Sequence, residues 1–472
     1  MRGRDALFPS FDDLVAVENA LTARLDKARR QYSSRKANAE EPSPEWLAEL
    51  QTKQFDRAED LEPLMDWVIE ALDQGNVQMT HPGYLGLFNP APSFASECAD
   101  RIASAFNPQI CVYSHAPAAV EIEQHVINEL ARRAGLPLGS GGHFTSGGAE
   151  ANSAAVLCAL QAKCPDYSDN GIGEFDGQPT IYVSKESHLA WLKMAHAAGI
   201  GRNAVRLIAT DGKGQMSVKA LETAVEADLE AGCVPVLIVA TAGTTNAGMV
   251  DPLNPSADLA ERHGMWFHVD AAWGGALIAS DDRRDALDGM ERAHSITIDA
   301  HKWFATTMGA GMFLTSRPDV PAQVFRVTAS YMPESDASKD FYLNSTQWSR
   351  RFVGLRLFLA LGAAGWDGYG EHVERSIDLT DRLTNRLKGG GWVHANSSVM
   401  GVSCMVPPEG HDDVQRYVDA IHEDGRYWIS KAVYEGKPVL RACVTNGRTD
   451  ERLIDELAKL LLQLAPQTSG IS

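Results

Sequence analysis

Apolar positions near the N-terminal end recur at helical spacing. They do so over residues 11–32, and a second helix is expected over residues 62–72. A polar stretch that contains prolines, residues 33–44, separates the two. Two helices broken in this way bury little on their own. We therefore expect their apolar faces to pack on the rest of the chain or on a second subunit.

From about residue 140, short β-rich runs alternate with helical patterns. Strands are expected over residues 180–184, 204–208, 234–241, 265–269, 295–298 and 311–315, and helices over 150–163, 188–198, 218–229 and 255–263. This alternation predicts an α/β domain with a mainly parallel sheet covered by helices on both faces. Because such sheets bind ligands outside the carboxyl ends of their strands, residues that follow strands are the candidates for a site.

The last part of the chain has a different pattern. A long helical pattern begins after Trp348, and strand-like runs follow at residues 402–406 and 438–444, which indicates a smaller α+β domain. We therefore divide the chain into an N-terminal helical segment (1–80), a large domain (81–365) and a small C-terminal domain (366–472). A chain of 472 residues is long enough for this division.

Composition narrows the function classes. The formal net charge of -19 argues against a protein that binds nucleic acid through its phosphates. No apolar run approaches the roughly 20 residues of a membrane helix, and residues 1–12 contain no apolar signal core. The seven cysteines are scattered and never spaced C-x-x-C, which favours free thiols over disulfides or a metal site. These features predict a cytoplasmic protein.

A glycine-rich turn precedes one of the predicted helices. Ser146, Gly147, Gly148 and Ala149 lie in the run T-S-G-G-A-E-A-N, and glycines ahead of a helix let backbone N–H groups approach an anion. The run matches neither the dinucleotide nor the ATP motif. Taken alone, it is more often an ordinary turn.

Two residues at strand ends have side chains that suit cofactor chemistry. Asp270 ends the predicted strand 265–269, where a carboxylate caps a helix, forms a salt bridge or pairs with a protonated pyridine nitrogen. Lys302 follows the next strand in D-A-H-K-W, between His301 and Trp303. Most lysines are solvated, but one at a strand end is a candidate for an imine with an aldehyde cofactor. His188 and Thr244 follow two further strands.

In the order glycine turn, His, Gly-Thr-Thr, Asp and His-Lys, these motifs resemble the group II pyridoxal-phosphate (PLP)-dependent amino-acid decarboxylases. The resemblance runs from about Met79 to Asn446. It implies the PLP-dependent transferase fold type I, PLP as cofactor, an amino acid as substrate, and a homodimer with active sites at the subunit interface.

The resemblance also implies residue roles. Lys302 binds PLP as a Schiff base, Asp270 pairs with the pyridine nitrogen, and His188 stacks on the ring and assists proton transfer. Thr244 supports the cofactor near Asp270. The phosphate is bound by the imidazole of His301 and by the backbone amides of Ser146, Gly147, Gly148 and Ala149.

Segments outside this core resemble the walls of the family's substrate pocket and its catalytic loop. Leu87, Phe88 and His115 lie in the wall segments, and Tyr331 stands where the family has a tyrosine that protonates the carbanion left by CO2. That tyrosine favours simple decarboxylation over oxidative aldehyde formation. Leu87 and His115 depart from the pattern of members that act on aromatic amino acids.

Two further residues keep open roles. Asp299 replaces the asparagine of Asn-Pro-His-Lys, and a carboxylate is a poor phosphate ligand because like charges repel. Arg441 could meet a substrate carboxylate or form a structural salt bridge.

The expected function is decarboxylation of an L-amino acid to its amine and CO2. The alternatives are other PLP chemistry on this fold, namely an oxidative aldehyde synthase, a carbon–carbon lyase or a transaminase, and an inactive binding or regulatory homologue. Acidic, aromatic, basic and aliphatic substrates all remain open.

Overall fold

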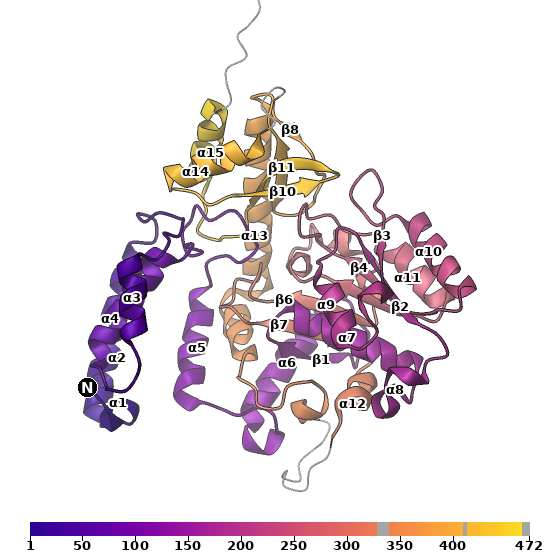
Figure 1. Ribbon diagram of the computed structural model, residues 1–472, viewed down its shortest axis with the longest axis horizontal. Helices are drawn as coiled ribbons and strands as arrows, with labels where there is room; N and C mark the ends of the chain where they lie inside the picture. The colour runs from indigo at the N-terminus through magenta and orange to yellow at the C-terminus, as the bar shows by residue number, and fades with distance from the viewer. Residues whose placement is uncertain (328–338, 409–412, 465–472) are drawn as a thin grey trace, which may run out of the picture.

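The computed structural model describes residues 1–327, 339–408 and 413–464 (Figure 1). Its larger sheet has seven strands in the order β1-β7-β6-β5-β4-β2-β3. Their bounds are β1 (Gly141–Thr145), β2 (Pro179–Ser184), β3 (Val205–Ile208), β4 (Val234–Thr241), β5 (Trp266–Asp270), β6 (Ser295–Asp299) and β7 (Gly311–Thr315). Most of these strands are buried along their whole length, as expected of a sheet covered on both faces.

Strands β2 to β6 pair in parallel, whereas β7 is antiparallel to both of its neighbours, β6 and β1. A parallel crossover needs a dozen or more residues and usually a helix, but only residues 300–310, which form no helix, join β6 to β7. The chain therefore turns back directly. The prediction of an α/β fold with a mainly parallel sheet is confirmed.

Helices cover both faces of this sheet. On one face lie α7 (Gly148–Lys163) and α9 (Ala190–Ala197), with α8 (Tyr167–Asn170) and α12 (Asp319–Phe325) beside α7. On the other face lie α6 (Pro117–Arg133), α10 (Val218–Glu230), α11 (Leu253–Arg262) and the first half of α13 (Gly354–Lys388). Four helices were predicted in this region, and α7, α9, α10 and α11 match them within two residues at each end.

The pattern did not predict β1, the edge strand that leads into the glycine turn. Two of its five residues are glycines, which weaken strand propensity. The strand needs them, because a Cβ on Gly142 would lie 2.0 Å from the carbonyl oxygen of Phe313 on β7. Close backbone approach, rather than side-chain propensity, therefore defines β1.

The small domain is built on an antiparallel sheet in the order β10-β11-β9-β8. Its elements are β8 (Val393–His394), β9 (Val402–Val406), α14 (Val414–Asp424), β10 (Ser430–Tyr434), β11 (Lys437–Cys443) and α15 (Glu451–Leu464). Helix α13 runs from the large sheet into this domain (Figure 1) and is interrupted at Gly365, where φ is 66°. The predicted boundary at 365/366 falls at this kink, and the division into domains stays a prediction.

The N-terminal helices α1 (Arg4–Leu7), α2 (Phe11–Arg30), α3 (Pro44–Thr52) and α4 (Leu61–Gly75) form an arm beside the body of the molecule, next to α5 (Phe94–Phe106) (Figure 1). The side chain of Ser10 accepts a hydrogen bond from the amide of Asp13 at 3.2 Å, which caps α2 where the pattern predicted its start. None of the residues in these four helices is buried.

Short 3₁₀ turns complete the described chain: η1 (Tyr113–His115), η2 (Ile172–Glu174), η3 (Arg202–Ala204), η4 (Gly274–Ala279), η5 (Arg284–Leu287), η6 (Met290–Arg292) and η7 (Phe341–Leu343). Among the described helices, none combines the length and the apolar character that a membrane span requires.

A buried ion pair joins α6 to the start of α13. Arg350 Nη2 lies 2.6 Å from Glu123 Oε1, and their side chains are 2% and 0% exposed. The other oxygen, Glu123 Oε2, accepts from the amide of Gly354 at 3.0 Å. Removing one member leaves an unpaired charge in the core, which costs more than losing an exposed pair.

We therefore expect Glu123→Ala to lower the free energy of unfolding by about 3–5 kcal/mol. Glu456→Ala, which removes the exposed partner of Arg452, should cause a much smaller loss. Urea unfolding of both variants measures the difference. Equal losses would show that the buried pair does not hold these two helices together.

Candidate active site

Nearly all of the predicted cofactor residues lie at one edge of the large sheet. Asp270 and Asp299 are the last residues of β5 and β6, and His188 and Thr244 follow β2 and β4. The glycine turn follows β1. Strands β1 and β6 are both antiparallel to β7, so β1 runs in the same direction as β6 and the other parallel strands. The carboxyl ends of parallel strands meet at one edge, so the topology itself gathers these groups.

The glycine turn leaves the N-terminus of α7 without a side-chain cap. In the described part of the chain, no hydrogen bond occupies the amides of Gly147, Gly148 and Ala149. The amide of Ser146, which was also predicted to bind phosphate, donates to Glu150 Oε2 at 2.7 Å. Open N–H groups at the positive end of a helix dipole suit an anion.

Neighbouring residues leave little space around this turn. A Cβ on Gly311 would lie 2.6 Å from Gly147 Cα, and a Cβ on Gly148 would lie 3.0 Å from Asp299 Oδ2. Larger residues would push the turn away from the strands. Gly148 and Gly311 are therefore required because a larger residue would not fit beside the open amides.

Lys302 and Asp299 form an ion pair at the mouth of this turn. Lys302 Nζ lies 2.9 Å from Asp299 Oδ2, and the Asp299 side chain is only 3% exposed. The second oxygen, Oδ1, is buried without a hydrogen-bond partner. His301 lies beside the pair, with its Nδ1 held by the backbone of Ala310 at 3.0 Å. Burial lowers the pKa of His301, so the imidazole is neutral near pH 7.

Asp270 is a buried carboxylate held by neutral donors. Its Oδ2 accepts from Asn152 Nδ2 at 2.9 Å and its Oδ1 from the amide of Ala272 at 3.2 Å. No lysine or arginine of the described chain forms an ion pair with it, which does not match the structural salt bridge that the sequence allowed. An ionised group in this position is costly unless a cation joins it.

His188 and Thr244 lie at the same edge but in different surroundings. The ring of His188 is exposed, and its Nδ1 accepts from the amide of Ala190 at 3.2 Å, which leaves Nε2 free. Thr244 is buried, and its hydroxyl accepts from the amide of Met249 at 3.0 Å. That bond closes the loop after β4.

Arg441 forms no salt bridge with the described residues, so the structural salt bridge that the sequence allowed is not present. Its guanidinium donates to the carbonyls of Thr245 and Asn246, at 3.0 and 3.1 Å, and to the carbonyl of Gly86. The side chain is buried and lies over the ring of Phe88. Arg441 therefore ties β11 of the small domain to loops of the large domain.

The predicted substrate-wall residues differ in their surroundings. Leu87 is 43% exposed, whereas Phe88 is buried against Trp273, with ring centroids 4.3 Å apart. His115 is exposed on η1, a turn joined to the main body by the Tyr113 amide, which donates to Asp340 at 2.8 Å. Tyr331 lies outside the described residues.

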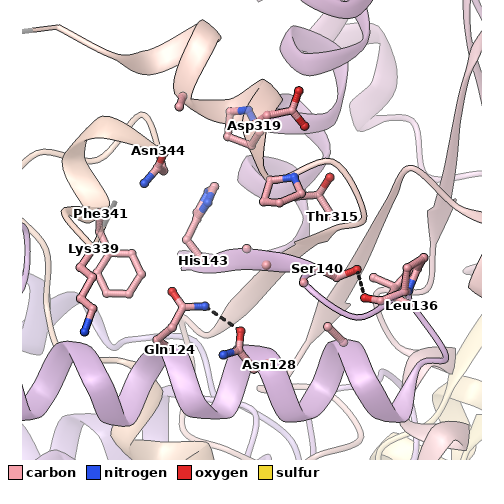
Figure 2. Close-up of a pocket in the computed structure, with 18 of the residues that line it drawn as sticks. Gln124, Asn128, Leu136, Ser140, His143, Thr315, Asp319, Lys339, Phe341 and Asn344 are labelled. Atoms are coloured by element: carbon pink, nitrogen blue, oxygen red, sulfur yellow. Dashed lines mark hydrogen bonds between the residues drawn. The ribbon is translucent and has the colours of Figure 1, made fainter. Parts of the chain in front are cut away.

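A cavity of about 1030 Å³ lies beside the edge strand β1, between α6 and the start of α12 (Figure 2). Figure 2 shows Gln124, His143 and Asn344 around it. None of its lining residues is among the predicted site residues. The cavity is therefore separate from the strand-end site.

Two residues of the site had no role in the sequence analysis. Asn152 ends the run T-S-G-G-A-E-A-N, and His268 stands two residues before Asp270, so that both point to the same region of the core. A polar residue inside a run of buried alanines on α7 was the available signal for Asn152.

Comparisons with known proteins agree with this geometry. Residues 44–395 match the family described as "Pyridoxal-dependent decarboxylase conserved domain". Acidic amino acid decarboxylase GADL1 of Bos taurus is 32% identical over 320 residues, which are 66% of this chain and 61% of the bovine protein. The match therefore spans less than two thirds of that relative. Aromatic-L-amino-acid decarboxylase of Bacillus atrophaeus is 28% identical, over 83% of this chain and 82% of its own.

Solved structures show the same fold. Mouse CSAD in apo form superposes with a TM-score of 0.87 at 26% identity, over 96% of this chain and 99% of its own. Oryza sativa TDC with PLP and tryptamine superposes with a TM-score of 0.91 at 21% identity, over 97% and 99%. The chain therefore belongs to the pyridoxal-dependent decarboxylase family, as the resemblance of its motifs predicted, and its cofactor is pyridoxal 5′-phosphate.

Proposed function

We propose that the protein removes the carboxyl group of an L-amino acid as CO2 and releases the amine, with PLP bound at the carboxyl edge of the large sheet. The observation that carries this proposal is the set of groups at that edge. The open amides of α7 suit the phosphate, the amine of Lys302 suits the aldehyde, and the carboxylate of Asp270 suits the ring nitrogen.

The charges at the edge fit the cofactor. Asp270 accepts hydrogen bonds from two neutral donors, so its negative charge is not yet paired with a cation. A protonated ring nitrogen would supply that positive charge. The buried Oδ1 of Asp299 lacks a partner, and its other oxygen holds Lys302. His301 is neutral because burial lowers its pKa, and when its Nδ1 accepts from the amide of Ala310 at 3.2 Å, its Nε2 carries a proton that an anion can accept.

PLP supplies the electron sink that receives the bonding electron pair as CO2 leaves. The chain supplies binding and proton control. Lys302 attaches the cofactor, Asp270 keeps the proton on the ring nitrogen, and the exposed ring of His188 covers the cofactor and moves a proton through its free Nε2. Thr244 supports the cofactor by fixing the loop after β4.

Tyr331, outside the described residues, is proposed to return the proton to the substrate carbon, which favours decarboxylation over oxidative aldehyde formation. No observation favours a carbon–carbon lyase, a transaminase or an inactive homologue. The relatives are named for acidic and for aromatic amino acids, so both classes belong in the first assays.

We propose a cytoplasmic homodimer. The four helices of the N-terminal arm have no buried residue, and Phe11 and Phe55 are 78% and 91% exposed, so the apolar side chains of the arm need a partner surface. The predicted wall residues Leu87 and His115 are exposed in the single chain, and a second copy at the interface would cover them. All seven cysteines are free, as expected in a reducing compartment.

The proposed reaction is tested by incubating the holoenzyme with each amino acid and measuring CO2 and product together. One substrate class should release CO2 and amine in equal amounts. Aldehyde with hydrogen peroxide, or an oxo acid without CO2, would instead identify different PLP chemistry.

The role of Asp270 is tested by Asp270→Ala. Because the ring nitrogen loses its charge partner, we expect weaker PLP binding and a fall in kcat of at least about a hundredfold. Asp282→Ala, which changes an exposed carboxylate outside the site, should behave as wild type. Near-normal turnover in Asp270→Ala would contradict the assigned role.

Asp299→Asn should strengthen PLP binding, by roughly tenfold, because it removes a negative charge that lies against Gly148 at the proposed phosphate site. Titration of the apoenzyme with PLP, followed by absorbance, gives the dissociation constant, and Asp282→Asn is the control. Weaker binding would show instead that the contact with Lys302 outweighs the repulsion.

Sedimentation of the purified protein should give a dimer. Phe11→Asp places a charge on the exposed apolar side of the arm and should raise the dimer dissociation constant and reduce activity with it. Leu138→Asp changes an equally exposed apolar residue outside the arm and should leave the dimer intact. A fully active monomer would rule out the interface.

A further inference from the structure

The carboxylate of Asp270 is the end of a buried chain of hydrogen bonds. Asn152 on α7 donates from Nδ2 to Asp270 Oδ2 at 2.9 Å. On its other side, Asn152 Oδ1 meets the hydroxyl of Thr297 at 2.6 Å and His268 Nε2 at 3.0 Å. These four side chains are 5% exposed or less, so solvent does not replace their hydrogen bonds.

The chain continues away from the site. His268 Nδ1 lies 2.8 Å from Ser295 Oγ, which also accepts from Trp266 Nε1 at 2.8 Å. An indole N–H only donates, and we assign the proton of Ser295 to the bond with His268 Nδ1. The remaining ring proton of His268 then sits on Nε2 and points at Asn152. Burial lowers the pKa of His268 to about 4, so the ring is neutral near pH 7.

These contacts fix the orientation of the Asn152 amide. If the amide were turned over, its oxygen would face the Asp270 carboxylate, and its NH2 group would face the Thr297 hydroxyl and the His268 N–H. With His268 protonated at Nε2 and Asp270 ionised, two donors lie on one side of the amide and an acceptor on the other, which favours the arrangement described. Asn152 therefore presents N–H groups to Asp270.

We propose that Asn152, oriented by His268 and Thr297, is a positioning residue that keeps Asp270 an ionised acceptor, so that the PLP ring nitrogen retains its proton. A hydrogen bond donated to a carboxylate stabilises the charged form. The proton between Asp270 and the ring nitrogen then stays on nitrogen. This inference rests on the proposed function.

The position of Asn152 on α7 adds a second consequence. The open amides that suit the phosphate lie at the first turn of this helix, and Asn152 lies one turn further along. One helix thus sets both the phosphate site and the partner of the ring nitrogen. A shift of α7 would disturb both ends of the cofactor together.

The test uses holoenzyme loaded with PLP that carries ¹⁵N in its ring, because the nitrogen chemical shift reports protonation directly. In wild type the ring nitrogen should be protonated. In Asn152→Leu, a change of similar volume without a donor, the resonance should move toward that of the unprotonated ring. We expect kcat to fall by about ten- to a hundredfold while KM stays within about twofold.

Thr297→Val is the milder variant, and it decides the matter if Asn152→Leu does not fold. It removes one hydroxyl that orients the amide and should shift the resonance partly, in the same direction. Thr384→Val is the matched control, because it also removes a buried hydroxyl, bonded to Ser403 Oγ at 2.7 Å but far from the site. Its resonance should equal that of wild type.

Two results would overturn the inference in distinguishable ways. A protonated ring nitrogen in wild type that remains fully protonated in Asn152→Leu and Thr297→Val would remove the role of Asn152 and leave the proposed function intact. An unprotonated ring nitrogen in wild type would overturn the role of Asp270, and the inference with it.

Discussion

The carboxylate of Asp270 lies buried at the end of β5, held by two neutral donors and by no lysine or arginine of the described chain. A charge in that position is unfavourable unless a cation completes it, and a protonated ring nitrogen is the cation that PLP brings. The buried hydrogen bonds from His268 through Asn152 lead to this single carboxylate. In the proposed function, the cofactor completes an electrostatic arrangement that the fold has already built.

The direct turn from β6 into β7 positions Lys302, the residue proposed to bind the cofactor. Because residues 300–310 contain no crossover helix, they stay at the carboxyl edge, where Lys302 meets Asp299 and the turn before α7. Tight backbone contacts at Gly142 and Gly311 bring β1 and that turn against β7. The sheet thus brings the proposed partners of the phosphate, the aldehyde and the ring nitrogen to one edge from three strands, β1, β6 and β5.

Much of this arrangement could be predicted from the sequence. Alternating periodicities located β2 to β7 and the helices between them, and strand ends pointed to Asp270 and Lys302. Strand β1 was not predicted because its glycines allow close backbone contact and so leave no hydrophobic pattern in the sequence. Arg441 donates hydrogen bonds to backbone carbonyls, and the proposed role of Asn152 depends on which end of its amide faces Asp270. The sequence pattern contains neither kind of information.

The central claim is that Lys302 carries the cofactor. Reduction of the holoenzyme with borohydride, followed by proteolysis and mass spectrometry, measures this directly. We expect a pyridoxyl group on the peptide that contains Lys302, and its loss in Lys302→Arg. A label on another lysine, or an equal label in Lys302→Arg, would contradict it.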